Sequence, residues 1–120
     1  MQIKSMDPVT LKKRLDEGSA ILIDVREPHE HAREHIEGAK LVPLSRFQAE
    51  NFAGLRDKTA VFHCHSGGRT SANAKLLTSK GFVDTCHLGG GIVAWKAAGL
   101  PTCSQQQRAG EGRRKLFGLF

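Results

Sequence analysis

The stretch TAVFHCHSGGRT, residues 59–70, places a thiol between a strand and a helix. Its first five residues are mostly apolar, as in a buried strand, whereas residues 71–80 favour a helix. At such a junction, unpaired N–H groups meet the positive end of the helix dipole, and both stabilise an anion. Cys64 therefore lies where its thiolate is favoured and where it can act as a nucleophile.

The residues that follow Cys64 support this prediction. Gly67 and Gly68 allow the chain to turn tightly with several N–H groups directed inward. Arg69 adds a permanent positive charge. A role as a small buried hydrophobic residue accounts for Cys86. It does not account for Cys64, where a strand, a thiol, two glycines, an arginine and a helix follow one another in this order. We therefore expect an anion-binding loop with a nucleophilic Cys64.

Strand and helix patterns alternate along the rest of the chain. The expected strands are residues 20–25, 40–43, 59–64 and 82–88, and the expected helices are residues 8–17, 28–34, 44–51, 71–80 and 92–98. This alternation predicts an α/β fold, a single three-layer domain with a central parallel sheet flanked by helices on both faces. Cys64 and Asp24 both end a strand, so we expect both at the carboxyl edge of the sheet, where sites in such folds lie.

Three more segments join the loop at 64–69 as motifs: ILIDVR at 21–26, HIEGA at 35–39 and LGGGIVAW at 88–95. In this order the four segments resemble the motifs of the rhodanese (sulfurtransferase) family, which often has glycine where Glu34 stands here. The resemblance covers residues 5–102, and it implies a rhodanese-like fold over the globular part of the chain.

The length of the loop separates two cysteine chemistries. Phosphotyrosine-type phosphatases carry five residues between Cys and Arg, whereas four residues, 65–68, lie between Cys64 and Arg69 here. A shorter loop makes a narrower cradle, which suits one sulfur on the cysteine better than a tetrahedral phosphate. A small phosphatase or arsenate reductase is the less favoured alternative. A non-catalytic rhodanese module that binds a partner is the third, and the intact Cys64 argues against it.

The resemblance implies a two-step sulfur transfer without a cofactor. Cys64, the expected catalytic residue, attacks the outer sulfur of a small anionic donor such as thiosulfate and becomes a persulfide. Cyanide, a thiol or an acceptor protein then takes the terminal sulfur. The expected substrate-binding loop consists of His65, Ser66, Gly67, Gly68 and Arg69.

Two roles remain open for Arg69. Its side chain either faces the substrate anion or pairs with a carboxylate such as Asp24 and braces the loop. For Asp24 we favour the bracing role. The role of Arg26 stays open, and His35 is expected to be a packed histidine.

Length and cysteine content indicate one domain in a reducing compartment. The chain has 120 residues, enough for one modest core, and three cysteines without a CxxC pair. This pattern argues against a disulfide framework, so we expect a cytoplasmic location. His63 and His65 flank Cys64, but alternation along a strand separates them from the thiol, and no metal site is expected.

The C-terminal tail differs from the rest of the chain. We expect a rhodanese-like domain over residues 1–103 and a basic, glycine-rich, flexible tail over residues 104–120, which ends in the apolar patch LFGLF. From residue 105 onward, four Lys or Arg against one Glu give a net charge of +3, half of the formal +6 of the chain. Three interpretations stay open: the tail contacts a membrane surface, it is the start of a truncated membrane segment, or it is a disordered end without a role. No nucleic-acid partner is expected, because the globular part lacks a basic-aromatic platform.

The loop-length argument predicts selectivity for sulfur over phosphate. We expect measurable sulfur transfer from thiosulfate to cyanide and negligible hydrolysis of para-nitrophenyl phosphate. One glycine inserted between Gly67 and Gly68 widens the loop, so that variant is expected to lose sulfur transfer. Faster hydrolysis of the aryl phosphate than sulfur transfer by the unmodified protein would show that loop length is the wrong discriminator.

Overall fold

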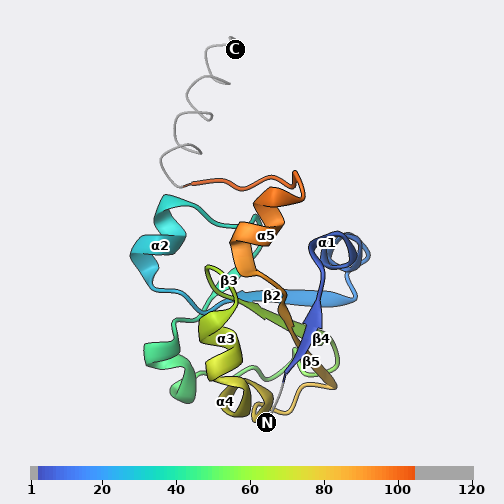
Figure 1. Ribbon diagram of the computed structural model, residues 1–120. Coiled ribbons are helices and arrows are strands. Elements are labelled where there is room, and N and C mark those ends of the chain that lie inside the picture. The colour runs from blue at the N-terminus through green and yellow to red at the C-terminus, as the bar shows by residue number, and fades with distance from the viewer. Residues whose placement is uncertain (1–2, 105–120) are drawn as a thin grey trace, which may run out of the picture.

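Strands and helices alternate through residues 3–104, the part of the chain that the computed structural model describes (Figure 1). The strands are β1 (Lys4–Met6), β2 (Ala20–Asp24), β3 (Lys40–Leu41), β4 (Thr59–His63) and β5 (Asp84–Leu88). The α-helices are α1 (Pro8–Asp16), α2 (Pro28–Arg33), α3 (Gly68–Ala72), α4 (Ala74–Thr78) and α5 (Gly91–Ala97), and η1 (Leu44–Ala49) is a 3-10 helix.

The five strands form one parallel sheet in the order β1-β5-β4-β2-β3. The central strand β4 pairs with β2 in a register that places Asp24 opposite His63. Because the strands are parallel, the ends of β2 and β4 meet at one edge of the sheet. Asp24 and Cys64 therefore lie at the same edge, as the sequence predicts.

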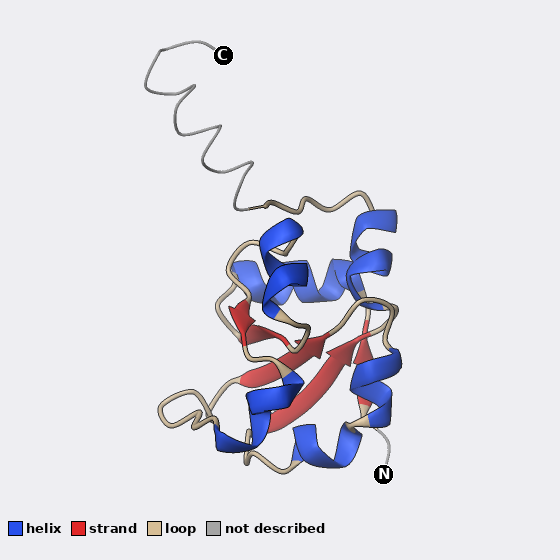
Figure 2. Ribbon diagram, turned by 90° about the vertical axis from the view of Figure 1, so that its left-hand side faces the viewer, coloured by secondary structure: helices blue, strands red, loops and turns tan. Residues whose placement is uncertain are grey.

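Helices cover both faces of the sheet, which confirms the predicted three-layer α/β fold (Figure 2). On one face, Leu11 of α1 and Trp95 of α5 pack against the sheet with Leu22 and Val61. On the other face, Phe47 of η1 and Leu77 of α4 join the apolar cluster that contains Cys64. This alternation of faces puts the thiol on the side of the sheet that η1 and α4 cover.

Local sequence signals account for the first helix. Asp7 caps α1, because its carboxylate accepts a hydrogen bond from Thr10 N at 3.0 Å. Pro8 occupies the first helical position, where no N–H partner is needed. Leu11 is fully buried and attaches the helix to the sheet.

Three elements differ from the expected ones. The single helix expected at 71–80 is divided into α3 and α4 by Asn73, whose φ of −111° and ψ of 23° leave the helical region. The helix expected at 44–51 is the 3-10 helix η1. The edge strand β1 was not expected, because only Met6 of its three residues is buried and so no alternation marks it.

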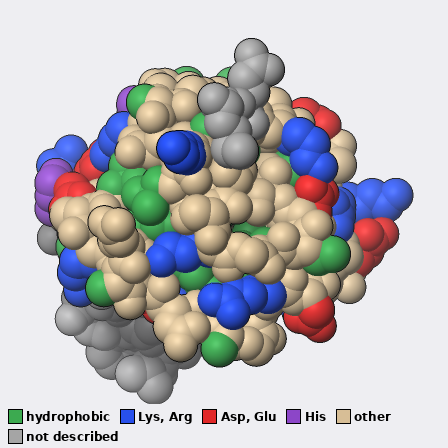
Figure 3. Space-filling view, turned by 90° about the horizontal axis from the view of Figure 1, so that it is seen from below, with side chains coloured by type: hydrophobic (Ala, Val, Ile, Leu, Met, Phe, Trp, Pro, Cys, Tyr) green, Lys and Arg blue, Asp and Glu red, His purple; other side chains and the backbone are tan. Residues whose placement is uncertain are grey.

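The predicted C-terminal tail falls almost wholly outside the described residues, so its flexibility and its boundary stay predictions. None of the helices in residues 3–104 is long and apolar enough to cross a membrane. On the face that Figure 3 shows, the Lys and Arg side chains of the described residues form separate groups with acidic side chains near the rim. That face therefore presents no continuous basic stripe.

Candidate active site

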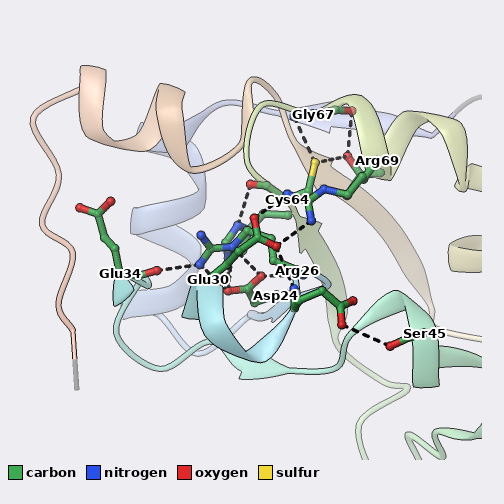
Figure 4. Close-up of polar contacts among 11 residues, drawn as sticks. Asp24, Arg26, Glu30, Glu34, Ser45, Cys64, Gly67 and Arg69 are labelled. Atoms are coloured by element: carbon green, nitrogen blue, oxygen red, sulfur yellow. Dashed lines mark hydrogen bonds and ion pairs between the residues drawn. The ribbon is translucent and has the colours of Figure 1, made fainter. Parts of the chain in front are cut away.

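Cys64 lies directly after β4 and is almost completely buried, with 1% of its surface exposed. The backbone N–H of Gly67 donates a hydrogen bond to Cys64 Sγ at 3.2 Å (Figure 4). An N–H donor at this distance stabilises negative charge on sulfur. The loop thus places one backbone donor, the Gly67 N–H, at the thiol, whereas several inward N–H groups were predicted from the sequence.

The glycines of the loop have specific conformational roles. Gly67 has a φ of +100°, a conformation that side chains rarely adopt, and it precedes the first residue of α3. This turn directs the Gly67 N–H back toward Cys64. His65, Ser66 and Gly68 are exposed, so they form the outer surface of the loop.

Helix α5 holds the loop from the other side. Ile92 N donates to Cys64 O at 3.1 Å, and Val93 N donates to His65 O at 3.1 Å. Gly91 makes this approach possible, because a Cβ there would lie 2.4 Å from His65 O and 2.6 Å from Cys64 O. This glycine motif was recognised only through a family resemblance, and the close approach of α5 to the loop is its physical reason.

Arg69 forms a two-pronged ion pair with Glu30 of α2. Its two terminal nitrogens lie 2.8 Å from the two carboxylate oxygens (Figure 4). The hydrogen bond from Arg69 lowers the pKa of Glu30 to about 2. The pair joins α2 to the first turn of α3, directly after the cysteine loop. Glu30 was not among the site residues expected from the sequence.

Asp24 pairs with Arg26 instead of Arg69, so the partner suggested from the sequence was wrong. Asp24 is fully buried and Arg26 is 4% exposed, and Arg26 Nη2 lies 2.8 Å from Asp24 Oδ2. Burial alone would raise the pKa of Asp24, but the hydrogen bonds from Arg26 outweigh it, and the pKa lies below its usual range. Arg26 also donates to the backbone oxygen of Glu34 at 2.7 Å, which ties the end of β2 to the end of α2.

A cleft of about 320 Å³ opens beside the loop and carries charges of both signs. Its lining includes Arg26, Arg33, Arg69, Glu30, Glu34 and His65. Arg26 is paired with Asp24 and Arg69 with Glu30, so Arg33 is the exposed guanidinium in this lining. Among residues 3–104, no group of three or more His, Cys, Asp or Glu side chains is arranged to hold a metal ion.

His63 lies at the end of β4 but is separated from the site chemistry. It is fully buried, and its Nε2 lies 3.6 Å from Asp24 Oδ2 without a hydrogen-bond partner. Burial lowers the pKa of His63, so the ring is neutral near pH 7. Alternation directs His63 to the face opposite Cys64, as the strand pattern predicts.

Thr70 and His87 lie near Cys64 but were not among the site residues predicted from the sequence. Thr70 Oγ1 lies 3.8 Å from Cys64 Sγ, and the same oxygen lies 2.7 Å from Nδ1 of His87 on β5. The position of Thr70 one residue after Arg69 could have been noticed, but the contact with His87 depends on the pairing of β4 with β5.

His35 is buried, 5% exposed, and contacts the third cysteine. Its Nε2 lies 3.3 Å from Cys103 Sγ, and its Nδ1 lies 2.7 Å from the backbone oxygen of His31. The backbones of His35 and Cys103 also exchange two hydrogen bonds, of 2.7 and 2.8 Å. These contacts fix the segment after α5 against the end of α2.

Comparisons with known proteins show the family of this chain. Residues 7–98 match the sequence model of the Rhodanese-like domain. The chain belongs to the rhodanese-like domain family. This match spans strands β2 to β5, the cysteine loop and the glycine segment at the start of α5, and it begins directly after β1.

Several named relatives of this rhodanese-like chain are sulfurtransferases. One relative is the probable adenylyltransferase/sulfurtransferase MoeZ of Mycobacterium tuberculosis, which is 43% identical over 94 residues. That match covers 76% of this chain and 24% of MoeZ. A second relative is a sulfurtransferase of Allochromatium vinosum, which is 31% identical over 100 residues. That match covers 82% of this chain and 94% of the relative. An uncharacterized Synechocystis protein is 42% identical over 95 residues, 79% of this chain and 53% of that protein. The chain thus spans about half of that last relative and a quarter of MoeZ.

Solved structures show the same rhodanese-like fold. The rhodanese-like domain of an Anabaena protein has a TM-score of 0.73 and 30% identity, and the match covers 90% of this chain and 84% of that one. A thiosulfate sulfurtransferase of Pseudomonas aeruginosa has a TM-score of 0.73 and 32% identity, with coverage of 86% and 20%. The fold and the family are therefore established together.

The buried Asp24–Arg26 pair predicts a large loss of stability when its carboxylate is removed. Asp24→Ala leaves the Arg26 charge buried without its partner, which costs about 3–5 kcal/mol of unfolding free energy. Asp16→Ala is the matched control, because the Lys12–Asp16 pair is exposed and is worth at most about 1 kcal/mol. Urea unfolding measures both, and equal, small losses would contradict the bracing role.

The Glu30–Arg69 pair predicts a specific acid dependence. The pKa of Glu30 falls from 4.5 to about 2 in the folded protein, so its stabilisation is complete above pH 4.5 and is lost as the pH falls toward 2. Arg69 is 38% exposed, so the contribution is about 1 kcal/mol. Glu30→Gln should lower the melting temperature near neutral pH and converge with the wild type in acid.

Glu17→Gln serves as the control for that measurement, because Glu17 is exposed on α1's C-terminal end. The control should follow the wild type at every pH. A constant difference between Glu30→Gln and wild type from neutral pH down to about pH 2 would contradict the ion-pair explanation.

Proposed function

We propose that this rhodanese-like domain transfers sulfane sulfur from thiosulfate, or a similar small anion, to cyanide or a thiol acceptor through a persulfide on Cys64. The observation that carries the proposal is the buried Cys64 Sγ with the Gly67 N–H at 3.2 Å. A reactive sulfur that is shielded from water and held by a backbone donor is suited to storing a persulfide. The sulfurtransferase names among its relatives support the same reaction class.

The first step forms the persulfide. The Cys64 thiolate attacks the outer sulfur of thiosulfate, a new S–S bond forms at Cys64, and the S–S bond of thiosulfate breaks as sulfite leaves with the electron pair. The terminal sulfur then carries the negative charge. The Gly67 N–H, which already donates to Cys64 Sγ, stabilises that charge.

The second step releases the sulfur. Cyanide or a thiolate attacks the terminal sulfur, the S–S bond at Cys64 breaks, and Cys64 leaves as a thiolate with the bonding electrons. The products are thiocyanate or a persulfide on the acceptor, and the protein returns to its starting state. In this proposal the acceptor approaches over His65 and Ser66, whose exposure supports that path.

Charges beside the loop bear on the binding of the donor. The guanidinium of Arg69 is held by both oxygens of Glu30, so its main contribution is to fix the position of α3 relative to α2. Arg33 lines the same cleft and is exposed. In this proposal Arg33 attracts the anionic donor, and Arg69 supports the loop.

Intact mass after incubation with thiosulfate tests this proposal. The wild type is expected to gain one sulfur, about 32 Da, and cyanide is expected to remove it. Cys64→Ser should show no gain, because the thiolate that receives the sulfur is absent. Cys86→Ser is the matched control, because Cys86 is buried on the opposite face, and it should keep the gain. A mass gain in Cys64→Ser that cyanide reverses would refute the role of Cys64.

A further inference from the structure

A chain of polar contacts connects Cys64 to a histidine outside the loop. The hydroxyl of Thr70 lies between Cys64 Sγ, at 3.8 Å, and His87 Nδ1, at 2.7 Å. Thr70 is fully buried and His87 is 8% exposed. The two side chains come from α3 and β5, so the contact is made by the tertiary structure and not by neighbours in the sequence. A single hydroxyl therefore bridges a thiol and an imidazole in a largely dry environment.

Counting protons couples the two ends of this chain in those arrangements where the Thr70 hydroxyl donates to Cys64 or to His87 rather than to Gly67 O. Thr70 has one hydroxyl proton and three groups within reach, because Gly67 O also lies 3.1 Å away. When the hydroxyl donates to a Cys64 thiolate, His87 Nδ1 has to carry a proton to donate to Oγ1. When the Cys64 thiol donates to Oγ1, the hydroxyl can donate to an unprotonated Nδ1.

We propose that His87 is a positioning residue that accepts the thiol proton of Cys64 through the Thr70 hydroxyl. The S–H bond of Cys64 breaks as Oγ1 takes up that proton, and the original hydroxyl proton of Thr70 passes to His87 Nδ1. The result is a thiolate and an imidazolium, with no change in total charge. This inference rests on the proposed function, since it supplies the nucleophile for persulfide formation.

The surroundings of His87 suit a proton acceptor. Its partners in the sheet are the uncharged Ser5 on β1 and Phe62 on β4. Burial lowers the pKa of His87, with no contribution from a charged group, so the ring is neutral near pH 7 and can accept a proton. The charged groups near the loop point elsewhere: Arg69 of α3 is paired with Glu30, and Asp24 and His63 belong to the opposite face of the sheet. On its own face, Cys64 is the titratable group that His87 meets, through Thr70.

Alkylation of Cys64 by iodoacetamide, measured by peptide mass from about pH 5 to pH 9, tests the relay without depending on sulfur transfer. His87→Asn keeps a hydrogen-bonding side chain but cannot take up a proton. Thr70→Val keeps the shape of the side chain but removes the hydroxyl. Both variants are expected to react about tenfold more slowly than wild type at pH 6 and to approach it at pH 9, where solvent removes the proton. Thr70→Ser retains the hydroxyl and should keep the wild-type profile.

Two further comparisons separate the relay from a merely structural contact. The double variant His87→Asn/Thr70→Val should be no slower than either single variant, because both interrupt one path. His29→Asn removes an exposed histidine of α2 and should keep the wild-type profile. A wild-type pH profile in His87→Asn overturns the proposal, and if that variant does not fold, the same result in Thr70→Val overturns it.

The same measurements distinguish this inference from the proposed function. A lowered rate at pH 6 in both variants supports the relay even when thiosulfate leaves no sulfur on the wild-type protein. In that case the proton path stands and the proposed sulfur donor is wrong. Normal loading with sulfur together with an unchanged pH profile in both variants retains the proposed function and rejects the relay.

Discussion

Two hydrogen bonds from the start of α5 to the carbonyl oxygens of Cys64 and His65 hold the cysteine loop against the sheet. They use N–H groups that a helix N-terminus cannot satisfy internally. They also require the close backbone approach that Gly91 permits, since any Cβ would collide with the same two carbonyl groups. With its carbonyl groups fixed in this way, the loop can direct the Gly67 N–H toward Cys64 Sγ. The arrangement of the thiol thus depends on a helix that begins 27 residues later in the chain.

Two ion pairs near this loop differ in what they contribute. The Asp24–Arg26 pair is buried, so its desolvation offsets much of its attraction, and its value lies in fixing the end of β2 to the backbone of Glu34. The Glu30–Arg69 pair is partly exposed and joins α2 to α3. Because both prongs of Arg69 are occupied, the loop arginine acts first as a connection between helices. In the proposed function, the anion-binding role that its charge suggests therefore falls to the exposed Arg33 of the same cleft.

The site was predictable from the sequence where neighbouring residues define it. Cys64 and Gly67 lie between a strand and a helix, and Arg69 lies in the first turn of that helix, so local geometry alone places a thiol beside an N–H donor and a cation nearby. Glu30 and His87 were not predictable in this way. Glu30 is 39 positions from Arg69, and His87 is 17 positions from Thr70. A partner at such a separation depends on the strand order and on which face each helix covers, and one sequence does not contain that information.

The sequence by itself determined the α/β alternation, the position of the thiol at a strand-to-helix junction and the length of its loop, because periodicity and spacing are local properties. It also determined that Asp24 and Cys64 share one edge, since both end strands of a parallel sheet. Only the tertiary structure decided which charges pair. Arg26, two residues after Asp24, forms the ion pair with the Asp24 carboxylate. Arg69 pairs with Glu30 instead. Pairing of β4 with β5 likewise brings His87 within hydrogen-bond distance of Thr70. Such a bond forms only when the folded chain brings the imidazole and the hydroxyl together.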